Sequence, residues 1–287
     1  MSKEPLAATV AAVRHADARG RSVEAASRPR VTMTPGNQLA HDLNGTGPLL
    51  VAIHGITENR SFWDPVRLQQ HFRVLRVDLR GHGDSPRTSP FGIDESVEDI
   101  HDLIGSLGED LTGDQSPFVV GHSLGGVIAT AYAARYPTRG VVNVDQSLRV
   151  GPLPAETAIA VRGEGFADFV RTVFASLYGE LDPVLVADIE RRRTLDQDVF
   201  SGFWTPLLDW DADTLAAWSR RTTSLPPDVP YLSLHGTDPG GDYADWLADR
   251  IPAAVAEQAP KRTHYPHLAQ PEWFVSRVHK FFSLDRS

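Results

Sequence analysis

A serine set among glycines is the residue whose surroundings most directly predict chemistry. Residues 121–126 read Gly-His-Ser-Leu-Gly-Gly and follow an apolar run, Phe-Val-Val, at 118–120. A Gly-x-Ser-x-Gly pattern between a strand and a helix is typical of a nucleophile elbow, a sharp turn that presents a serine hydroxyl to a carbonyl carbon. Glycines are required there because a Cβ would clash with the neighbouring backbone. We therefore predict that Ser123 is a nucleophile.

The elements that must position this serine follow a repeating pattern. Short apolar runs are separated mostly by helix-patterned segments, which is typical of a parallel sheet with crossover helices. The runs are Leu49–Ile53, Val74–Val77, Phe118–Val120, Val141–Val144 and Tyr231–Leu234. Polar residues or glycines follow each run, at the strand ends where such sheets bind ligands. The sequence predicts an α/β fold, a mostly parallel central sheet with helices on both faces.

Together with the elbow, three more segments resemble motifs of the α/β-hydrolase family, in the order in which that family has them. His54-Gly55-Ile56 resembles the oxyanion loop, residues 78–85 resemble an Asp-x-Arg-Gly-x-Gly-x-Ser turn, and residues 264–271 resemble the loop of the catalytic histidine. The resemblance implies a Ser-His-acid triad that carries out acyl transfer.

The general base that the resemblance implies is His264. Serine is a poor nucleophile unless a base lies within hydrogen-bonding reach. The histidine loop departs from the family pattern at Thr263, where glycine is usual, and at Ala269, where glutamate is usual. His267, three residues further on, is the alternative base.

The acid of the triad has two main candidates. In the family it usually lies three residues after the glycine that ends the strand starting here at Tyr231, but that position is Pro239. Asp238 lies one residue earlier and is slightly favoured over Asp145, which follows the run ending at Val144. Asp238 would otherwise be a turn residue and Asp145 a cap that accepts backbone amides. Asp242 is a remote third candidate.

The oxyanion formed by attack on a carbonyl carbon needs two donors fixed in advance. The elbow geometry assigns this role to the backbone N–H groups of Ile56 and Leu124. No cofactor is expected. No metal is expected either, since the sequence has no His-Glu-x-x-His and no close group of histidines and carboxylates at metal-binding spacing.

Composition limits the classes of partner. The net charge of −9 and the absence of a basic stripe with aromatic residues argue against binding of nucleic acid. No apolar stretch is long enough to span a bilayer. The chain has no cysteine, which fits a cytoplasmic location. The oligomeric state is not predicted.

The predicted organisation has three parts. Residues 1–30 form an N-terminal extension, helical or mobile; residues 31–147 and 229–287 form the hydrolase core; residues 148–228 form a helical cap rich in aromatic side chains. Within the cap segment, Arg191-Arg192-Arg193 is expected to be a solvated helix face.

The expected function is hydrolysis of a small or medium apolar carboxylic ester or lactone by a serine hydrolase, through an acyl-enzyme. The same residues would also serve carbon–carbon bond hydrolysis or cofactor-free perhydrolysis. A small-molecule receptor on the same scaffold is the remaining alternative, and the retained serine, histidine and acids argue against it.

Overall fold

The computed structural model describes residues 32–34, 37–108 and 116–283. Contacts divide the chain into two units, Met1–Arg30 and Val31–Ser287. The expected N-terminal extension lies outside the described residues, and the described fold belongs to the second unit.

An eight-stranded sheet runs through the described residues, in the order β1-β2-β4-β3-β5-β6-β7-β8. The strands are β1 (Thr32–Thr34), β2 (Asn37–Asn44), β3 (Leu49–Ile53), β4 (Arg73–Val77), β5 (Phe118–His122), β6 (Gly140–Val144), β7 (Tyr231–His235) and β8 (Ala254–Gln258). β2 pairs antiparallel with β1 and β4, and the other neighbouring strands pair in parallel. The mostly parallel sheet is confirmed.

Three of these strands, β1, β2 and β8, were not among the predicted runs. β8 is an edge strand, and Val255 at its centre is half exposed. A strand in this position does not need a continuous apolar sequence, and β8 has none. β2 contains the buried carboxylate of Asp42, which is compensated by Arg76 at 2.6 Å rather than by apolar neighbours. A continuous apolar run therefore marks the central strands, while an edge strand or a strand with a buried ion pair lacks one.

The central strands contribute side chains to two separate cores. In β3, Leu49, Val51 and Ile53 pack in one apolar cluster, while Leu50 and Ala52 pack in the other. This follows from the alternation of side chains along a strand. Since both clusters are buried, the run reads as continuously apolar and not as alternating.

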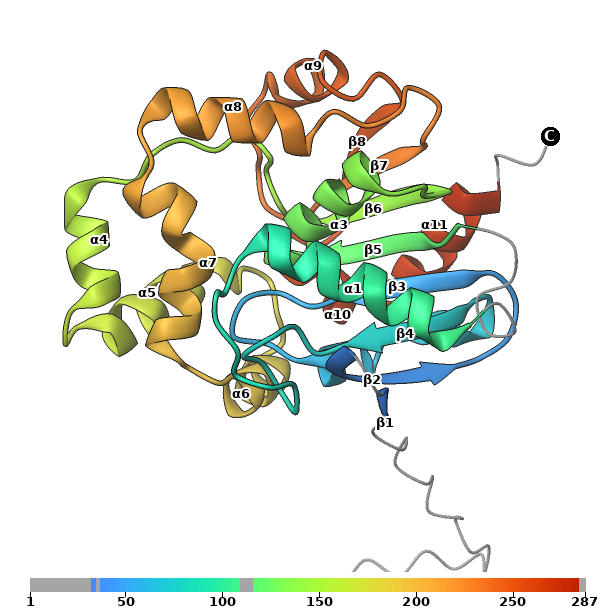
Figure 1. Cartoon of the computed structure of the whole chain (residues 1–287), viewed down its shortest axis with the longest axis horizontal. Coiled ribbons are helices and arrows are strands. Elements are labelled where there is room, and N and C mark those ends of the chain that lie inside the picture. Colours follow the sequence, from blue (N-terminus) through green and yellow to red (C-terminus); the bar gives the residue numbers. More distant parts are fainter. Residues whose placement is uncertain (1–31, 35–36, 109–115, 284–287) are drawn as a thin grey trace, which may run out of the picture. The chain divides into compact units, whose positions relative to one another are not determined.

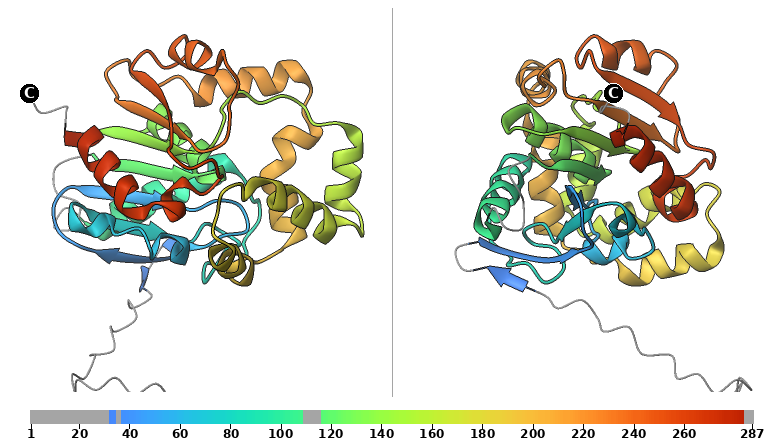
Figure 2. Two further views of the ribbon diagram at one scale, coloured as in Figure 1. Left: turned by 180° about the vertical axis from the view of Figure 1, so that it is seen from behind. Right: turned by 90° about the vertical axis from the view of Figure 1, so that its right-hand side faces the viewer.

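Helices cover both faces of the sheet (Figures 1 and 2). α1 (Ile93–Leu107) and α3 (Leu124–Arg135) lie on one face and contribute to the first cluster. α11 (Pro271–Ser283) lies on the other, with Phe274, Val278 and Phe282 in the second cluster. The shorter helices are η1 (Arg60–Trp63), η2 (Leu68–Gln70), α9 (Tyr243–Ala248) and α10 (Pro266–Ala269).

The segment between β6 and β7 is helical, as its sequence pattern predicts. It contains α4 (Ala155–Arg162), α5 (Phe166–Leu177), α6 (Pro183–Arg192), α7 (Gln197–Asp209) and α8 (Ala212–Thr222). Asp182, Asp196 and Asp211 cap α6, α7 and α8 by accepting backbone N–H bonds. Figure 1 shows α4 to α7 beside one end of the sheet, away from its two faces.

Candidate active site

Ser123 occupies the turn between β5 and α3, with φ 52° and ψ −122°. This positive-φ conformation is uncommon for a residue with a side chain and marks a strained functional turn. A Cβ on Gly121 would lie 1.9 Å from the carbonyl O of Gly125, and one on Gly125 would lie 2.3 Å from the carbonyl O of Ile53. The strand, turn and helix required of a nucleophile elbow are therefore present.

His264 lies between β8 and α10 and is held at both its backbone and its ring. Its N–H donates to the carbonyl O of Leu177, the last residue of α5, at 2.9 Å. Its ring Nδ1 lies 2.6 Å from Oδ2 of Asp145. Because Nδ1 is engaged by the carboxylate, Nε2 is the nitrogen left to accept a proton from a serine.

Asp145 directly follows β6, at φ 53°, and is almost completely buried. Its Oδ1 accepts the N–H groups of Gly236 at 2.6 Å and Thr237 at 2.8 Å, and its Oδ2 accepts the Thr237 hydroxyl at 2.9 Å. Burial raises the pKa of the Asp145 carboxyl, but the hydrogen bond and charge of His264 and the Thr237 donors outweigh burial and lower this pKa to about 2. Asp145 is therefore ionised at neutral pH.

The carboxylate that contacts His264 is thus Asp145, and the preference for Asp238 is corrected. Asp238 is exposed, and its Oδ1 accepts the N–H of Gly240 at 2.9 Å inside its own turn. The loop after β7 supplies the donors that hold Asp145, instead of supplying the acid itself. Asp242 lies 2.9 Å from a guanidinium nitrogen of Arg149 in an exposed ion pair.

The imidazole of His264 is kept neutral by its surroundings. Burial is the main cause and lowers its pKa below the ordinary value; the hydrogen bond to Asp145 opposes burial, and the charge of His122 lowers the pKa further. A neutral imidazole at physiological pH is the form that a general base requires.

His267, the alternative base, is placed differently. Its ring packs 5.0 Å from that of Trp63 and 4.5 Å from that of His122, centroid to centroid. Neither ring nitrogen has a hydrogen-bond partner among the described residues, and burial lowers the pKa of His267 well below its usual range. It does not line the cavity that contains Ser123 and His264.

This cavity, of about 230 Å³, is lined by Ser123, His264, Ile56 and Leu124, the four residues predicted for the nucleophile, the base and the oxyanion site. As the first residue of α3, Leu124 has a backbone N–H that the helix itself leaves unbonded. Gln146 is the other polar lining residue. The remaining lining residues are apolar: Ile93, Val127, Val150, Val170, Val173, Phe174, Leu177, Phe200, Phe203, Trp204, Pro206, Leu207 and Trp218.

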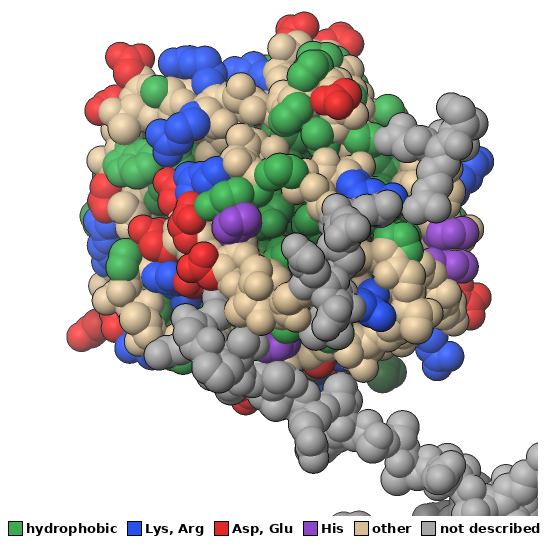
Figure 3. Space-filling view, turned by 45° about the vertical axis from the view of Figure 1, so that its right-hand side comes forward, with side chains coloured by type: hydrophobic (Ala, Val, Ile, Leu, Met, Phe, Trp, Pro, Cys, Tyr) green, Lys and Arg blue, Asp and Glu red, His purple; other side chains and the backbone are tan. Residues whose placement is uncertain are grey.

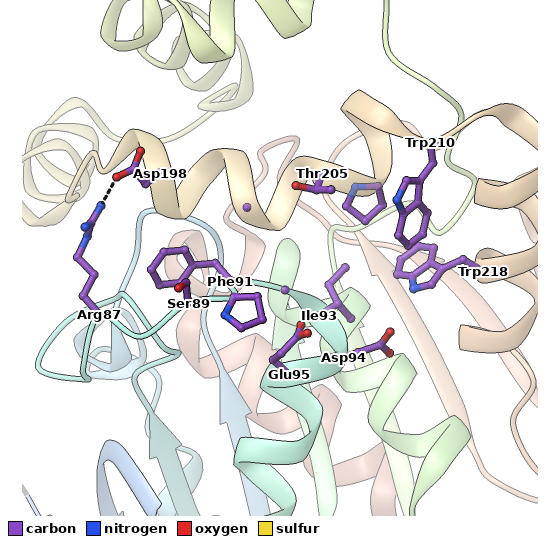
Figure 4. A pocket seen from close by; sticks show the side chains of 14 residues that line it. Arg87, Ser89, Phe91, Ile93, Asp94, Glu95, Asp198, Thr205, Trp210 and Trp218 are labelled. Atoms are coloured by element: carbon purple, nitrogen blue, oxygen red, sulfur yellow. Dashed lines mark hydrogen bonds and ion pairs between the residues drawn. The ribbon is translucent and has the colours of Figure 1, made fainter.

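A wider groove of about 640 Å³ lies next to the cavity and shares Ile93, Pro206 and Trp218 with it. Figure 4 shows the groove between the start of α1 and α7, with Glu95 on one side and Thr205 on the other. The other charged side chains in its lining include Arg87, Asp94 and Asp198. The groove and the cavity therefore have part of one wall in common.

The described residues contain no group of three or more His, Cys, Asp or Glu side chains suited to a metal ion. None of the helices in this part of the chain is both long and apolar enough to cross a membrane. On the face seen in Figure 3, acidic and basic side chains lie side by side.

Comparison with known proteins identifies the family. A model described as "Alpha/beta hydrolase family" matches residues 50–277 of this chain. The chain belongs to the alpha/beta hydrolase family. The hydrolase is 34% identical over 255 residues to 2-(acetamidomethylene)succinate hydrolase of Mesorhizobium japonicum, covering 83% of this chain and 88% of the relative. It is 38% identical over 261 residues to a pimeloyl-[acyl-carrier protein] methyl ester esterase of Nitrosospira multiformis, covering 83% and 95%.

Among solved structures, the hydrolase is similar to the enol-lactonase from Burkholderia xenovorans. The TM-score is 0.71 at 23% identity, and the match covers 88% of this chain and 100% of the lactonase. This likeness shows the fold.

Two of the three arginines that the sequence placed on a solvated helix face are largely buried in the hydrolase. Arg191 is exposed, but the side chains of Arg192 and Arg193 are only 14% and 3% exposed. The Arg193 guanidinium donates to Thr57 Oγ1 at 2.5 Å and to the hydroxyl of Tyr265, and it stacks on Phe174. Arg193 thus ties the end of α6 to the oxyanion loop and to the histidine loop. Its position in a run of three arginines gave no signal of this.

Proposed function

We propose that this hydrolase cleaves small or medium carboxylic esters or lactones through an acyl-enzyme on Ser123. The observation that carries the proposal is an apolar cavity lined by both Ser123 and His264, with Asp145 bonded to the far side of the imidazole. This is the arrangement of nucleophile, base and orienting acid by which serine hydrolases work.

In the first half of the reaction, the Ser123 hydroxyl attacks the substrate carbonyl carbon and its proton passes to Nε2 of His264. Asp145 stabilises the imidazolium that forms. The negative charge on the carbonyl oxygen is received by the N–H groups of Ile56 and Leu124. Collapse releases the alcohol with the proton from His264 and leaves an acyl-serine.

In the second half, a water molecule gives a proton to Nε2 of His264 and attacks the acyl carbonyl carbon. The ester bond to Ser123 breaks, the serine oxygen takes the proton back, and the carboxylic acid leaves. For a lactone, the alcohol and the acid are parts of one product.

The lining of the cavity limits the substrate class. Among the described residues, no Lys, Arg, Asp or Glu side chain lines it, and Gln146 is the only polar lining residue besides Ser123 and His264. Burying a charged group in such a site is costly unless it is paired. We therefore assign a neutral, apolar substrate to this cavity. A succinate derivative, as named for the Mesorhizobium relative, would find no cation in the described lining other than a protonated His264.

We assign residues 148–228, which contain the helices α4 to α8, the role of a cap over the cavity. Their support is that ten of the lining residues come from α5, α7 and α8: Val170, Val173, Phe174, Leu177, Phe200, Phe203, Trp204, Pro206, Leu207 and Trp218. A cytoplasmic location is proposed as well, on the lack of cysteine.

The experiment is a substrate panel with wild type and Ser123→Ala. Nitrophenyl acetate, butyrate and octanoate, a γ-lactone and a nitrophenyl ester with a free carboxylate are compared by kcat/KM. Wild type is expected to prefer neutral substrates, and Ser123→Ala is expected to lose several orders of magnitude in kcat. Preference for the charged ester would contradict the substrate class. Near wild-type turnover by folded Ser123→Ala would contradict the mechanism, and cleavage of a vinylogous diketone but of no ester would transfer the function to carbon–carbon hydrolysis.

A further inference from the structure

Two buried side chains that the triad does not use, Glu58 and His122, are in contact next to the base. Glu58 is 2% exposed and His122 is 0% exposed. Oε2 of Glu58 lies 3.1 Å from Nδ1 of His122. The same oxygen accepts the backbone N–H of Gly55 at 2.7 Å.

The contact made by Nε2 of His122 shows which ring nitrogen carries a proton. Nε2 lies 2.8 Å from the main-chain carbonyl O of His264. A carbonyl only accepts hydrogen bonds, so Nε2 carries a proton. A neutral imidazole would then have a bare Nδ1 facing an oxygen of Glu58, with no proton between two acceptors. The contact is satisfied only when the pair holds one more proton, between Nδ1 and Oε2.

That extra proton belongs on His122. Oε2 of Glu58 already accepts the N–H of Gly55, and the guanidinium of Arg193 lies nearby; both favour a carboxylate. Burial raises the pKa of the Glu58 carboxyl, but the charge and hydrogen bond of His122 and the charge of Arg193 outweigh it and hold this pKa below its usual range. The pair is an imidazolium and a carboxylate.

We propose that Glu58 and His122 are positioning residues, an ion pair that joins the oxyanion loop to the loop of His264 and sets the proton affinity of that base. Gly55 precedes the oxyanion donor Ile56, and His122 precedes Ser123 in the chain. One pair of side chains thus contacts all three segments of the site. The inference rests on the proposed function, because it takes His264 as the base.

The charges around this pair decide the direction of its effect. The rings of His122 and His264 are 4.7 Å apart, centroid to centroid, and a positive charge at this distance opposes protonation of His264. The negative charge of Glu58 favours protonation of His264, but its effect on the pKa of His264 is weaker than that of His122. The other titratable or charged groups that face the pair are His54 after β3, His82 after β4, Asp145 after β6, Arg193 after α6, and Tyr265 and His267 in the histidine loop.

The direct test is ¹⁵N NMR of histidine-labelled protein, which requires no turnover. At pH 7 both ring nitrogens of His122 are expected to carry protons in wild type. In Glu58→Gln, only one is expected to, because the negative acceptor is gone. A single protonated nitrogen on His122 in wild type, or no change in Glu58→Gln, overturns the ion pair, whether or not the enzyme cleaves esters.

The effect on the base is tested with His122→Gln, whose amide keeps a donor for the carbonyl of His264 without the charge. The NMR titration midpoint of His264 is expected to rise by about one pH unit. The acidic limb of kcat/KM is expected to move with it. The control is His41→Gln, a buried histidine on β2 that contacts the carbonyl O of Leu39, and it is expected to leave the midpoint unchanged. If the midpoint of His264 were the same in wild type, His122→Gln and His41→Gln, the pair would have only a structural role.

Glu58→Gln provides the second variant if His122→Gln does not fold. In this variant a neutral His122 that still donates from Nε2 to the carbonyl of His264 needs a donor at its Nδ1, while the N–H of Gly55 needs an acceptor at the same place. One atom of the Gln amide cannot be both. A roughly 10- to 100-fold loss of kcat with little change in KM is expected from the displaced base. An unchanged kcat overturns the positioning role, while absence of ester turnover in wild type, with the NMR result as expected, overturns only the proposed function.

Discussion

Replacing Asp145 with asparagine isolates the orienting role of the acid, because the structure dictates how the new amide must lie. The N–H groups of Gly236 and Thr237 both donate to Oδ1 of Asp145, so the oxygen of the introduced amide takes that place. The amide NH₂ then takes the place of Oδ2, 2.6 Å from Nδ1 of His264 in the native protein. A donor at this position requires a bare Nδ1 and moves the imidazole proton to Nε2.

An imidazole protonated at Nε2 cannot accept the proton of Ser123. We therefore expect Asp145→Asn to lower kcat by about three to four orders of magnitude. At ~1.4 kcal/mol for each tenfold change, this equals about 4–5.5 kcal/mol of lost transition-state stabilisation. The assay is steady-state hydrolysis of nitrophenyl butyrate, with folding checked by thermal unfolding.

The control is Asp238→Asn, which changes an exposed carboxylate in the adjacent turn. It is expected to retain nearly wild-type turnover. If folded Asp145→Asn kept more than a tenth of wild-type kcat, or if Asp238→Asn lost as much as Asp145→Asn, the assignment of the acid would be wrong.

Three other outcomes are expected. Because burial lowers the pKa of His264 and the neutral form is the base, activity is present above that pKa and lost as pH falls through it; the midpoint of kcat/KM should lie below about 6.5, and a midpoint above about 7 would contradict this. Burial also lowers the pKa of His54 to about 4 and of His82 to about 3, so the unfolded chain binds protons first as pH falls below about 6.5. Each of these two histidines should therefore lower the free energy of unfolding by about 2 kcal/mol when the pH falls from about 7 to about 5. Urea unfolding at the two pH values measures this, and equal stability would refute it. Gly125→Ala would place a Cβ 2.3 Å from the carbonyl O of Ile53 and should cost about 1–3 kcal/mol, whereas an unchanged urea midpoint would show that the elbow relaxes freely.

Much of the site could be predicted because its chemistry is local in sequence. The elbow around Ser123 needs glycines at fixed spacing, and the positions of Ile56 and Leu124, the residues proposed as oxyanion donors, follow from recognisable motifs next to them. The structure places these residues with His264 around one cavity. The central strands were predictable for a related reason, since burial on both faces leaves a continuous apolar run.

The remainder depends on how loops meet in space. Asp145 and Asp238 both follow strands, and spacing alone does not show which loop turns toward His264. The structure shows the loop after β7 turning its backbone N–H groups to Asp145 and leaving Asp238 in solvent. Likewise, Glu58 and His122 are 64 residues apart, and no pattern in either segment indicates that they meet.

The central claim, an acyl-enzyme on Ser123, is tested most directly by trapping it. Wild type is mixed with excess nitrophenyl butyrate, quenched in acid within milliseconds, and analysed by intact mass and peptide mapping. We expect a burst of about one nitrophenolate per chain when deacylation is slower than acylation, and a butyryl group on the peptide that contains Ser123. A butyryl group on another residue of an active enzyme, or hydrolysis by folded Ser123→Ala at the wild-type rate, would contradict it.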